Sequence, residues 1–335
     1  MKYENMNITV DITTKCNLKC KHCRTNAINH ELSMGEIDTI IEKWKPFKPR
    51  AVFISGGEPL VRKDIVDIVK KFKKLAPITI INTNSLLLTE ELLKDLIDAG
   101  TNYIQVSLDG IREEHDKVRG VGTYDRVIEK LKLINKYSSK IKLHISSLVS
   151  SLNVDQMEEF VHQIIDVNKI DVEILGFKRF IPNNEMAGIC NLGTTGLKKM
   201  FENLQKLQVE YKDKVQIVAD FPLKNVYQKD LVKKIMDKYK LDCAGCSAGV
   251  NGICVRNDGT VSPCSLLYIS CGNILKQDLS EILDSEPINL LKKRALKGKC
   301  GSCKYKMICG GCRAAAYMLS GDYLGEDSEC YYVES

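Results

Sequence analysis

Three closely spaced cysteines near the start of the chain are the first residues whose types and spacing could do chemistry. Cys16, Cys20 and Cys23 form a C-x3-C-x2-C run in a loop that directly follows a β-rich segment. Three thiolates can hold three irons of a [4Fe–4S] cube and leave the fourth iron open to an outside ligand. A zinc loop is the alternative, but three cysteines with no fourth nearby leave tetrahedral zinc incomplete. The run therefore predicts a reactive iron–sulfur site.

A second group holds ten of the 14 cysteines, between Cys243 and Cys330. Cys246 is followed after 12 residues by Gly259, and four residues separate Gly259 from Cys264. A C-x2-C-x5-C-x2-C run and one later cysteine complete the group: Cys300, Cys303, Cys309, Cys312 and Cys330. A zinc ribbon is the alternative for the two C-x2-C pairs. It usually separates its pairs by about 15–20 residues, whereas only five intervene here.

Glycine and polar residues follow three further β-rich segments. They are Gly56-Gly57-Glu58-Pro59, Asn82-Thr83-Asn84 and Ser107-Leu108-Asp109-Gly110. Paired glycines let a backbone approach a ligand closely, because they carry no side chain. A tight turn is the alternative for Gly56-Gly57, and a surface turn is the alternative for the segment from Ser107 to Gly110.

Repeated βα units must position these residues, because short β-rich runs alternate with helical periods through the first half of the chain. Expected helices follow caps at Ser33, Thr89 and Asn153. The expected strands are Ile8–Ile12, Ala51–Ser55, Ile78–Asn82, Tyr103–Leu108, Lys142–Leu148 and Val172–Leu175. The fold class is therefore α/β, a partial (β/α)6 TIM-like barrel with its chemistry at the carboxyl ends of the strands.

The composition changes after the sixth strand and divides the chain into three expected regions. Residues 1–180 form the barrel, 181–240 a helical connector and 241–335 a small cysteine-rich domain. The connector is expected to hold helices over Thr195–Tyr211 and Asn225–Tyr239. Asn257-Asp258-Gly259 predicts a hairpin turn in the last region.

Composition excludes several classes of protein. With 335 residues, 44% of them hydrophobic, the chain can bury a core without disulfide staples. No window approaches the roughly 18 apolar residues of a membrane span, and there is no signal peptide, so a cytoplasmic location and no membrane partner are expected. The net charge of +6 is mild, and paired lysines fall within helical patterns, so no nucleic-acid partner is expected.

Taken together, the first cysteine run and the motifs after the strands resemble the radical S-adenosylmethionine (SAM) superfamily. The resemblance covers nearly the whole chain and implies a [4Fe–4S] cluster on Cys16, Cys20 and Cys23. It implies that reduction of bound SAM yields a 5′-deoxyadenosyl radical, which abstracts hydrogen from the substrate. The SAM-binding residues that it implies are His22, Gly56, Gly57, Glu58, Pro59, Asn82, Asn84, Ser107 and Asp109.

The second cysteine group is similar to the SPASM extension of that superfamily. It differs in one spacing, because two residues separate Cys309 from Cys312 where the family pattern has three. The resemblance implies two auxiliary [4Fe–4S] clusters, hence three clusters in all. Cluster one takes Cys246, Cys264 and Cys312. Its fourth ligand is Cys243, with Cys254 or an open site as alternatives. Cluster two takes Cys300, Cys303, Cys309 and Cys330.

Enzymes with this extension mostly modify ribosomally made peptides or proteins. The resemblance therefore favours an oxidative peptide or protein modification such as a thioether or carbon–carbon cross-link. The partners would be a flavodoxin or ferredoxin-type reductant and a peptide or protein substrate, captured directly or through a separate recognition protein. The alternative is tetrapyrrole side-chain modification in an alternative haem or haem d1 pathway, whose enzymes the tail Cys309–Ala316 with Gly321–Leu324 also resembles. A non-enzymatic iron–sulfur electron carrier is the alternative of another class.

Four further residues have only weak assignments. Cys190, on the loop after the sixth strand, is a candidate catalytic hydrogen-atom donor, with an incidental buried thiol as the alternative. Cys271 is expected to be a small buried hydrophobe. Arg119 and Arg179 follow strands and could meet carboxylates.

Overall fold

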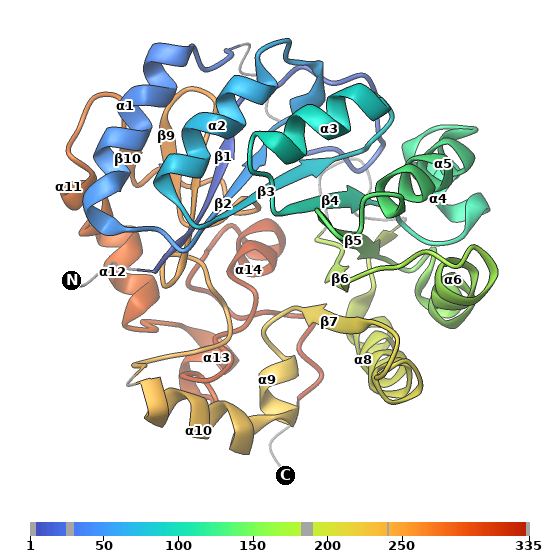
Figure 1. Ribbon diagram of the computed structural model, residues 1–335. Coiled ribbons are helices and arrows are strands. Elements are labelled where there is room, and N and C mark those ends of the chain that lie inside the picture. The colour runs from blue at the N-terminus through green and yellow to red at the C-terminus, as the bar shows by residue number, and fades with distance from the viewer. Residues whose placement is uncertain (1–4, 25–29, 182–189, 240, 333–335) are drawn as a thin grey trace.

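The computed structural model describes residues 5–24, 30–181, 190–239 and 241–332. Seven strands run parallel and in chain order through its sheet (Figure 1). They are β1 (Asn7–Asp11), β2 (Ala51–Ser55), β3 (Ile78–Thr83), β4 (Tyr103–Ser107), β5 (Lys142–Val149), β6 (Ile174–Arg179) and β7 (Gln216–Asp220). The sheet stays open, with β7 at one edge. The expected α/β fold with a partial barrel is confirmed.

Helices connect these strands and cover the outer side of the curved sheet (Figure 1). They are α1 (Met34–Trp44), α2 (Ile65–Leu75), α3 (Glu90–Asp98), α4 (Arg112–Arg119), α5 (Thr123–Asn135), α6 (Met157–His162) and α8 (Gly193–Glu210). Shorter helical turns lie at η1 (Lys45–Phe47), η2 (Pro59–Val61), η3 (Val154–Gln156) and η4 (Gln163–Val167).

Two of the three expected helix caps are confirmed. Ser33 and Glu36 form a capping box at α1, in which the Glu36 N–H donates to Ser33 Oγ over 3.2 Å. The Leu92 N–H donates to Thr89 Oγ1 at the start of α3. Asn153 does precede the helical turn η3, as expected, but its side chain makes no cap hydrogen bond and its amide donates to the carbonyl oxygens of Asp109 and Leu148.

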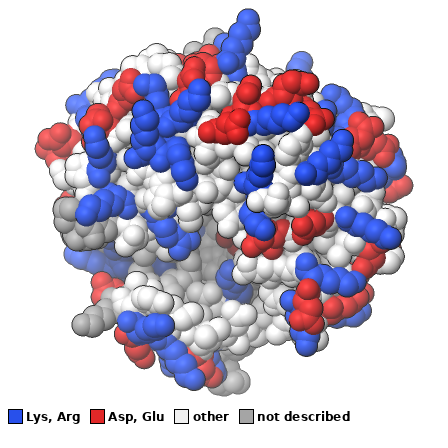
Figure 2. Space-filling view, viewed as in Figure 1, with Lys and Arg blue, Asp and Glu red and all other residues white. Residues whose placement is uncertain are grey.

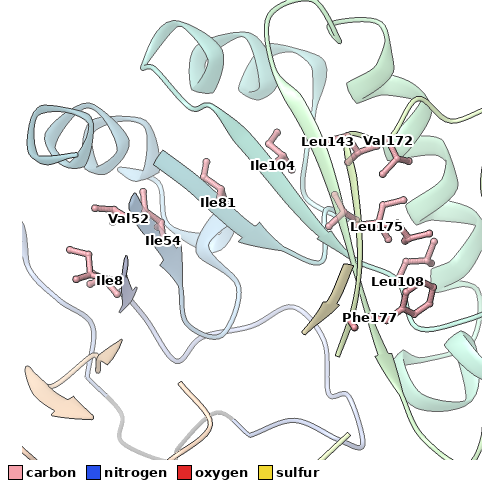
Figure 3. Close-up of a cluster of buried hydrophobic side chains, with 14 of the residues drawn as sticks. Ile8, Val52, Ile54, Ile81, Ile104, Leu108, Leu143, Val172, Leu175 and Phe177 are labelled. Atoms are coloured by element: carbon pink, nitrogen blue, oxygen red, sulfur yellow. The ribbon is translucent and has the colours of Figure 1, made fainter. Parts of the chain in front are cut away.

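The hydrophobic core lies between the sheet and these helices. Because successive side chains of a strand point to opposite faces of the sheet, every second residue of a strand contributes to this core. Ile54 is registered with Ile81, and Ile81 with Ile104, so their side chains form one apolar row on the outer face (Figure 3). Residues of the opposite parity, including Asp11, Ser55 and Lys178, face the inner side of the sheet. The sheet thus separates a hydrophobic core from a polar interior.

The C-terminal region continues the same sheet. Its strands are β8 (Gly252–Val255), β9 (Thr260–Ser262) and β10 (Gly272–Asn273), and β8 pairs in parallel with β1. Because β8 and β9 are antiparallel, the hairpin turn at Asn257-Asp258-Gly259 is confirmed. Two helices precede this region, α9 (Lys224–Tyr227) and α10 (Lys229–Tyr239), and its own helices are α11 (Leu279–Leu283), α12 (Glu286–Lys292), α13 (Gly298–Ser302) and α14 (Arg313–Ser320). The division into 1–180, 181–240 and 241–335 stays a prediction.

Two differences from the expected elements bear on the site. β7 was not expected, since it is a short edge strand whose buried side chains are only Ile217 and Ala219. β6 ends at Arg179, four residues beyond the expected end, because it continues to pair with β7 up to Lys178. This extension brings Lys178 and Arg179 to the carboxyl end of the sheet.

The surface has a mixed charge. On the face shown in Figure 2, Lys and Arg side chains are interspersed with Asp and Glu. Across the described residues, the structure has no helix that is both long enough and apolar enough to span a bilayer.

Candidate functional site

A cavity of about 320 Å³ lies at the carboxyl ends of the strands, on the inner side of the sheet. We call it the main cavity. It brings together all three cysteines of the first run and most of the expected SAM-binding residues. Those that line it are Cys16, Cys20, His22, Cys23, Gly56, Gly57, Glu58, Asn82, Asn84, Ser107 and Asp109. Pro59 is not part of the lining and is buried at the first position of η2.

The paired glycines after β2 hold the cysteine loop against the sheet. The N–H of Gly57 donates to the Thr13 carbonyl over 2.8 Å, and the N–H of Glu58 donates to the Lys15 carbonyl over 2.9 Å. A Cβ on Gly56 would lie 2.3 Å from the Thr13 oxygen, and one on Gly57 would lie 2.3 Å from the Lys15 oxygen. Glycine is therefore required because the cysteine loop, and not only a ligand, approaches the backbone here.

Glu58 is buried and joins the ends of β2 and β3. Its carboxylate accepts hydrogen bonds from Thr83 Oγ1 over 2.6 Å and from the Asn84 N–H over 2.7 Å. It also accepts from the Leu60 N–H over 3.1 Å. Burial raises the pKa of this carboxyl, while these donors oppose the shift. Glu58 therefore acts mainly as a positioning residue for β3, although it reaches the cavity wall.

Asn84 connects β3 to the cysteine loop. Its Nδ2 donates to Asn17 Oδ1 over 2.8 Å and lies 3.9 Å from Cys16 Sγ. The same sulfur accepts from the Leu18 N–H over 3.4 Å. Donors of this kind stabilise a thiolate and tune a cluster that it ligates.

Asp109 anchors the opposite wall of the cavity. Its carboxylate accepts from Arg119 Nε over 2.6 Å and from the Leu148 N–H over 2.8 Å, and His22 Nε2 lies 3.8 Å away. Burial is the largest single effect and raises the pKa of Asp109, but the charge and hydrogen bond of Arg119 together with the nearby histidines outweigh it, so the pKa is lowered. Burial lowers the pKa of His22 to about 4, so its ring is neutral at pH 7. Arg119 thus meets a carboxylate of the chain itself.

Two buried polar atoms in the wall test whether SAM fits. Asn82 Oδ1 and His22 Nδ1 are buried and have no hydrogen-bond partner among the described residues. Because such atoms are costly to leave unpaired, they are suited to a polar ligand. SAM, with an amino group, a carboxylate and an adenine, fits this wall, and the three thiols beside it fit an iron–sulfur cluster.

A second cavity, of about 300 Å³, fits cluster two. It is lined by all four cysteines of the expected set: Cys300, Cys303, Cys309 and Cys330. Backbone N–H groups donate to three of the sulfurs, including Tyr305 to Cys303 over 3.3 Å and Gly311 to Cys309 over 3.4 Å. A Cβ on Gly311 would lie 2.9 Å from Cys300 Sγ, so this glycine leaves room for the sulfur.

Cys246 lies at the centre of the group expected for cluster one. Burial raises the pKa values of Cys243 and Cys264, and of Cys312 to about 12, and the Cys246 charge adds to each shift. Cys254 is placed differently. Its Sγ donates to Asp11 Oδ2 over 3.7 Å, and β8 holds it opposite Thr9 of β1. The Cys264 charge nevertheless also raises the pKa of Cys254, so the choice of Cys243 over Cys254 as the fourth ligand stays a prediction.

The cysteines do not converge on single ions. In the described ranges, no three His, Cys, Asp or Glu side chains are close enough together to hold one metal ion. A cube of four irons needs thiolates spaced around it instead.

Cys190 lies beside the main cavity and does not line it. It is buried against Phe180 in a small space of about 10 Å³ that also borders His22 and Asp109. Its role as a hydrogen-atom donor stays a prediction. Cys271 is buried in the main hydrophobic core, as expected.

Several residues of the cavity wall were not expected from the sequence, among them Arg24, Lys178, Arg256 and Tyr268. Arg256 donates to Asp11 over 3.1 Å and stacks on the Tyr268 ring, 4.0 Å from its centroid. The Tyr268 hydroxyl in turn donates to the Arg24 carbonyl. Lys178 reaches the same cavity from β6. These residues are single members of separate segments, so no spacing in the sequence marks them.

Curated relatives match this chain over almost its whole length. The "AdoMet-dependent heme synthase" of Methanosarcina barkeri (strain Fusaro / DSM 804) is 29% identical over 97% of this chain and 96% of its own. The "Fe-coproporphyrin III synthase" of the same strain is 27% identical, covering 97% and 87%. The "Pre-heme d1 synthase" of Dinoroseobacter shibae is 24% identical, covering 96% and 85%. The expectation that this chain acts on a peptide or protein is wrong on this finding.

Solved structures share the fold. Streptococcus suis SuiB superposes with a TM-score of 0.77 at 20% identity, over 98% of this chain and 77% of that one. The structure of anSMEcpe with bound AdoMet superposes with a TM-score of 0.74 at 19% identity, over 97% and 93%.

Replacing Gly57 with alanine should expel the cysteine loop, because the new Cβ would overlap the Lys15 carbonyl. Three clusters hold about 12 iron atoms per chain. We expect the variant to keep about eight and to cleave SAM at least tenfold more slowly. Iron analysis and 5′-deoxyadenosine formation measure this. Gly35→Ala is the control, since nothing lies within 4 Å of its Cβ. A Gly57→Ala variant that keeps about 12 iron atoms per chain would show that the cysteine loop tolerates the added methyl group.

Replacing Cys243 or Cys254 with alanine should decide the fourth ligand of cluster one. We expect Cys243→Ala to fall from about 12 to about eight iron atoms per chain, while Cys254→Ala keeps about 12. The reason is that Cys243 lies beside Cys246, whereas Cys254 contacts Asp11. The opposite pattern would assign the ligand to Cys254.

Family models agree with the two cysteine sites. The model described as "Radical SAM superfamily" matches residues 10–164, which contain the end of β1, the first cysteine run and the strands β2 to β5. The model described as "Iron-sulfur cluster-binding domain", SPASM, matches residues 243–304 and begins at Cys243. The cavity fits SAM, and the cysteines fit [4Fe–4S] clusters. The chain is therefore a radical SAM enzyme with a C-terminal SPASM domain, and SAM and [4Fe–4S] clusters are its cofactors.

Proposed function

We propose that this radical SAM enzyme modifies a side chain of a tetrapyrrole. The observation that carries the proposal is the end-to-end match to three relatives that are named as synthases of heme, Fe-coproporphyrin III and pre-heme d1. These alignments span at least 96% of the chain, so they include the main cavity as well as the auxiliary cysteines.

The charges in the main cavity support a substrate that carries carboxylates. Many biosynthetic tetrapyrroles carry propionate groups on an apolar ring, and a cationic wall attracts such groups. Five cationic side chains line the cavity: Arg24, Arg119, Lys178, Arg179 and Arg256. Three carboxylates line it: Asp11, Glu58 and Asp109. Because Arg179 is paired with Asp327 and Glu329 behind the wall, the other four cations face three carboxylates, which leaves an excess of one positive charge before SAM and substrate bind.

Lys178 is the cation that is best placed to meet a substrate carboxylate. Arg119, Arg179 and Arg256 donate to carboxylates of the chain over 2.6 to 3.1 Å. Lys178 lies 3.8 Å from Asp220, and Asp220 is itself largely exposed on edge strand β7. This weak surface pair leaves the lysine charge available.

The protein's own residues would hold and orient the reacting groups. When bound, the reduced cluster and SAM supply a radical that abstracts hydrogen from an unactivated carbon. Asn82 and His22 offer SAM their unpartnered polar atoms, and the Asp109–Arg119 pair keeps the His22 ring in place. The electron would come from a flavodoxin or ferredoxin-type protein.

An anaerobic assay with iron coproporphyrin III tests the proposal. With SAM and dithionite, we expect formation of 5′-deoxyadenosine to rise at least tenfold when the tetrapyrrole is added. Mass spectrometry should show a change confined to a side chain. The matched control is the tetramethyl ester of the same compound, which lacks the carboxylates. Turnover that is unaffected by either compound, or an unchanged tetrapyrrole, would contradict the proposal.

Replacing Lys178 with methionine should weaken binding of the tetrapyrrole. Loss of one charged contact costs about 1.4 kcal/mol, so we expect KM to rise about tenfold while SAM cleavage without substrate is unchanged. Lys142→Met is the control. Lys142 is the first residue of the neighbouring strand β5, pairs with Glu173 and does not line the cavity. Equal KM values for both variants would remove Lys178 from the substrate site.

A further inference from the structure

A buried group of three charged side chains connects the main cavity to the auxiliary cysteines. Arg179 lies at the end of β6 and lines the main cavity. Asp327 and Glu329 lie in the tail after α14, about 150 residues away in the chain, and all three are buried. We call these residues the charge triad.

The contacts within the charge triad are close and paired. Arg179 Nη1 donates to Asp327 Oδ2 over 2.8 Å, and Nη2 donates to Asp327 Oδ1 over 3.0 Å. Nη2 also donates to Glu329, whose other oxygen accepts from the Gly193 N–H over 3.0 Å. The Asp327 charge raises the pKa of Arg179 against the effect of burial, so the guanidinium stays charged. The triad carries one positive and two negative charges, a net charge of −1.

Asp327 also contacts cysteines of both expected auxiliary clusters. Its Oδ2 accepts from the Cys312 N–H over 3.0 Å, and its own N–H donates to Cys300 Sγ over 3.4 Å. Its carbonyl accepts from the Cys330 N–H over 3.0 Å. Cys312 belongs to the set expected for cluster one, and Cys300 and Cys330 belong to the set for cluster two. One buried carboxylate therefore lies between the two sites.

A fixed charge next to an iron–sulfur cluster shifts its reduction potential, because reduction adds a negative charge to the cluster. A neighbouring carboxylate opposes that added charge, and a guanidinium favours it. The effect is large where both charges are buried, since water does not screen them.

We propose that the charge triad sets the reduction potentials of the auxiliary clusters, with Asp327 lowering them and Arg179 raising them. Asp327 and Arg179 are positioning residues here, because they act on the clusters through Cys300, Cys312 and Cys330. Arg179 also lines the main cavity. A carboxylate that binds beside it would therefore change the charge felt by the auxiliary clusters.

Two variants separate an effect of charge from a loss of structure. Asp327→Asn keeps the shape and the backbone contacts but takes the triad from −1 to zero. The double variant Arg179→Gln/Asp327→Asn removes both charges and leaves Glu329, so its net charge is again −1. Asp322→Asn is the matched control, because Asp322 lies in the same tail and pairs with Lys297 near the surface.

Anaerobic EPR titration of the reconstituted full chain measures the outcome. At a fixed dye potential, we expect Asp327→Asn to raise the ratio of reduced to oxidised auxiliary cluster about tenfold. The double variant should return to within threefold of the wild-type ratio, and Asp322→Asn should not differ from it. All variants should keep about 12 iron atoms per chain.

Three results would overturn the proposal. The first is an Asp327→Asn ratio equal to that of the wild type. The second is a double variant whose ratio of reduced to oxidised cluster changes as much as that of the single variant, because a merely structural defect would persist in both. The third is loss of auxiliary iron from both variants, which would show that the triad builds the sites without tuning them.

Discussion

The placement of the cysteine loop against the ends of β2 and β3 is the constraint on which the whole site depends. Gly57 and Glu58 hold the loop through its carbonyl oxygens, and the Glu58 carboxylate holds Asn84 at the end of β3. Asn84 then returns to the loop at Asn17. The cysteine loop, the end of β2 and the end of β3 are therefore each bonded to the other two. These mutual hydrogen bonds fix Cys16 at one wall of the main cavity.

The sheet carries this geometry onward to the auxiliary sites. β8 pairs with β1 in parallel, so the cysteine-rich region extends the sheet from the strand that precedes the cysteine loop. At the other end of the barrel, β6 presents Arg179 to Asp327. The C-terminal region is therefore tied to both sides of the open barrel. This explains how charges near the auxiliary cysteines can be fixed relative to the main cavity.

Local signals in the sequence predicted much of the fold and many residues of the cavity wall. Period-two strands, caps at Ser33 and Thr89, and the spacing of the cysteines are all short-range patterns. The parts that were missed depend on distant partners. β7 is recognisable only through its pairing with β6, and the contact of Arg179 with Asp327 joins residues about 150 positions apart. The glycine pair was noticed, but its neighbour, the Lys15 carbonyl, is visible only in three dimensions.

The substrate was predicted wrongly for a different physical reason. The SPASM pattern specifies how clusters are held, and the same fold and cluster sites occur in enzymes that act on different substrates. We propose that discrimination among substrates comes from side chains such as Lys178, which reaches the cavity from β6. Such a position follows no shared spacing, because it needs only the right charge at the end of its own strand. Cluster ligands therefore identify the chemistry, whereas the proposed choice of substrate rests on single side chains of the cavity wall that no spacing marks.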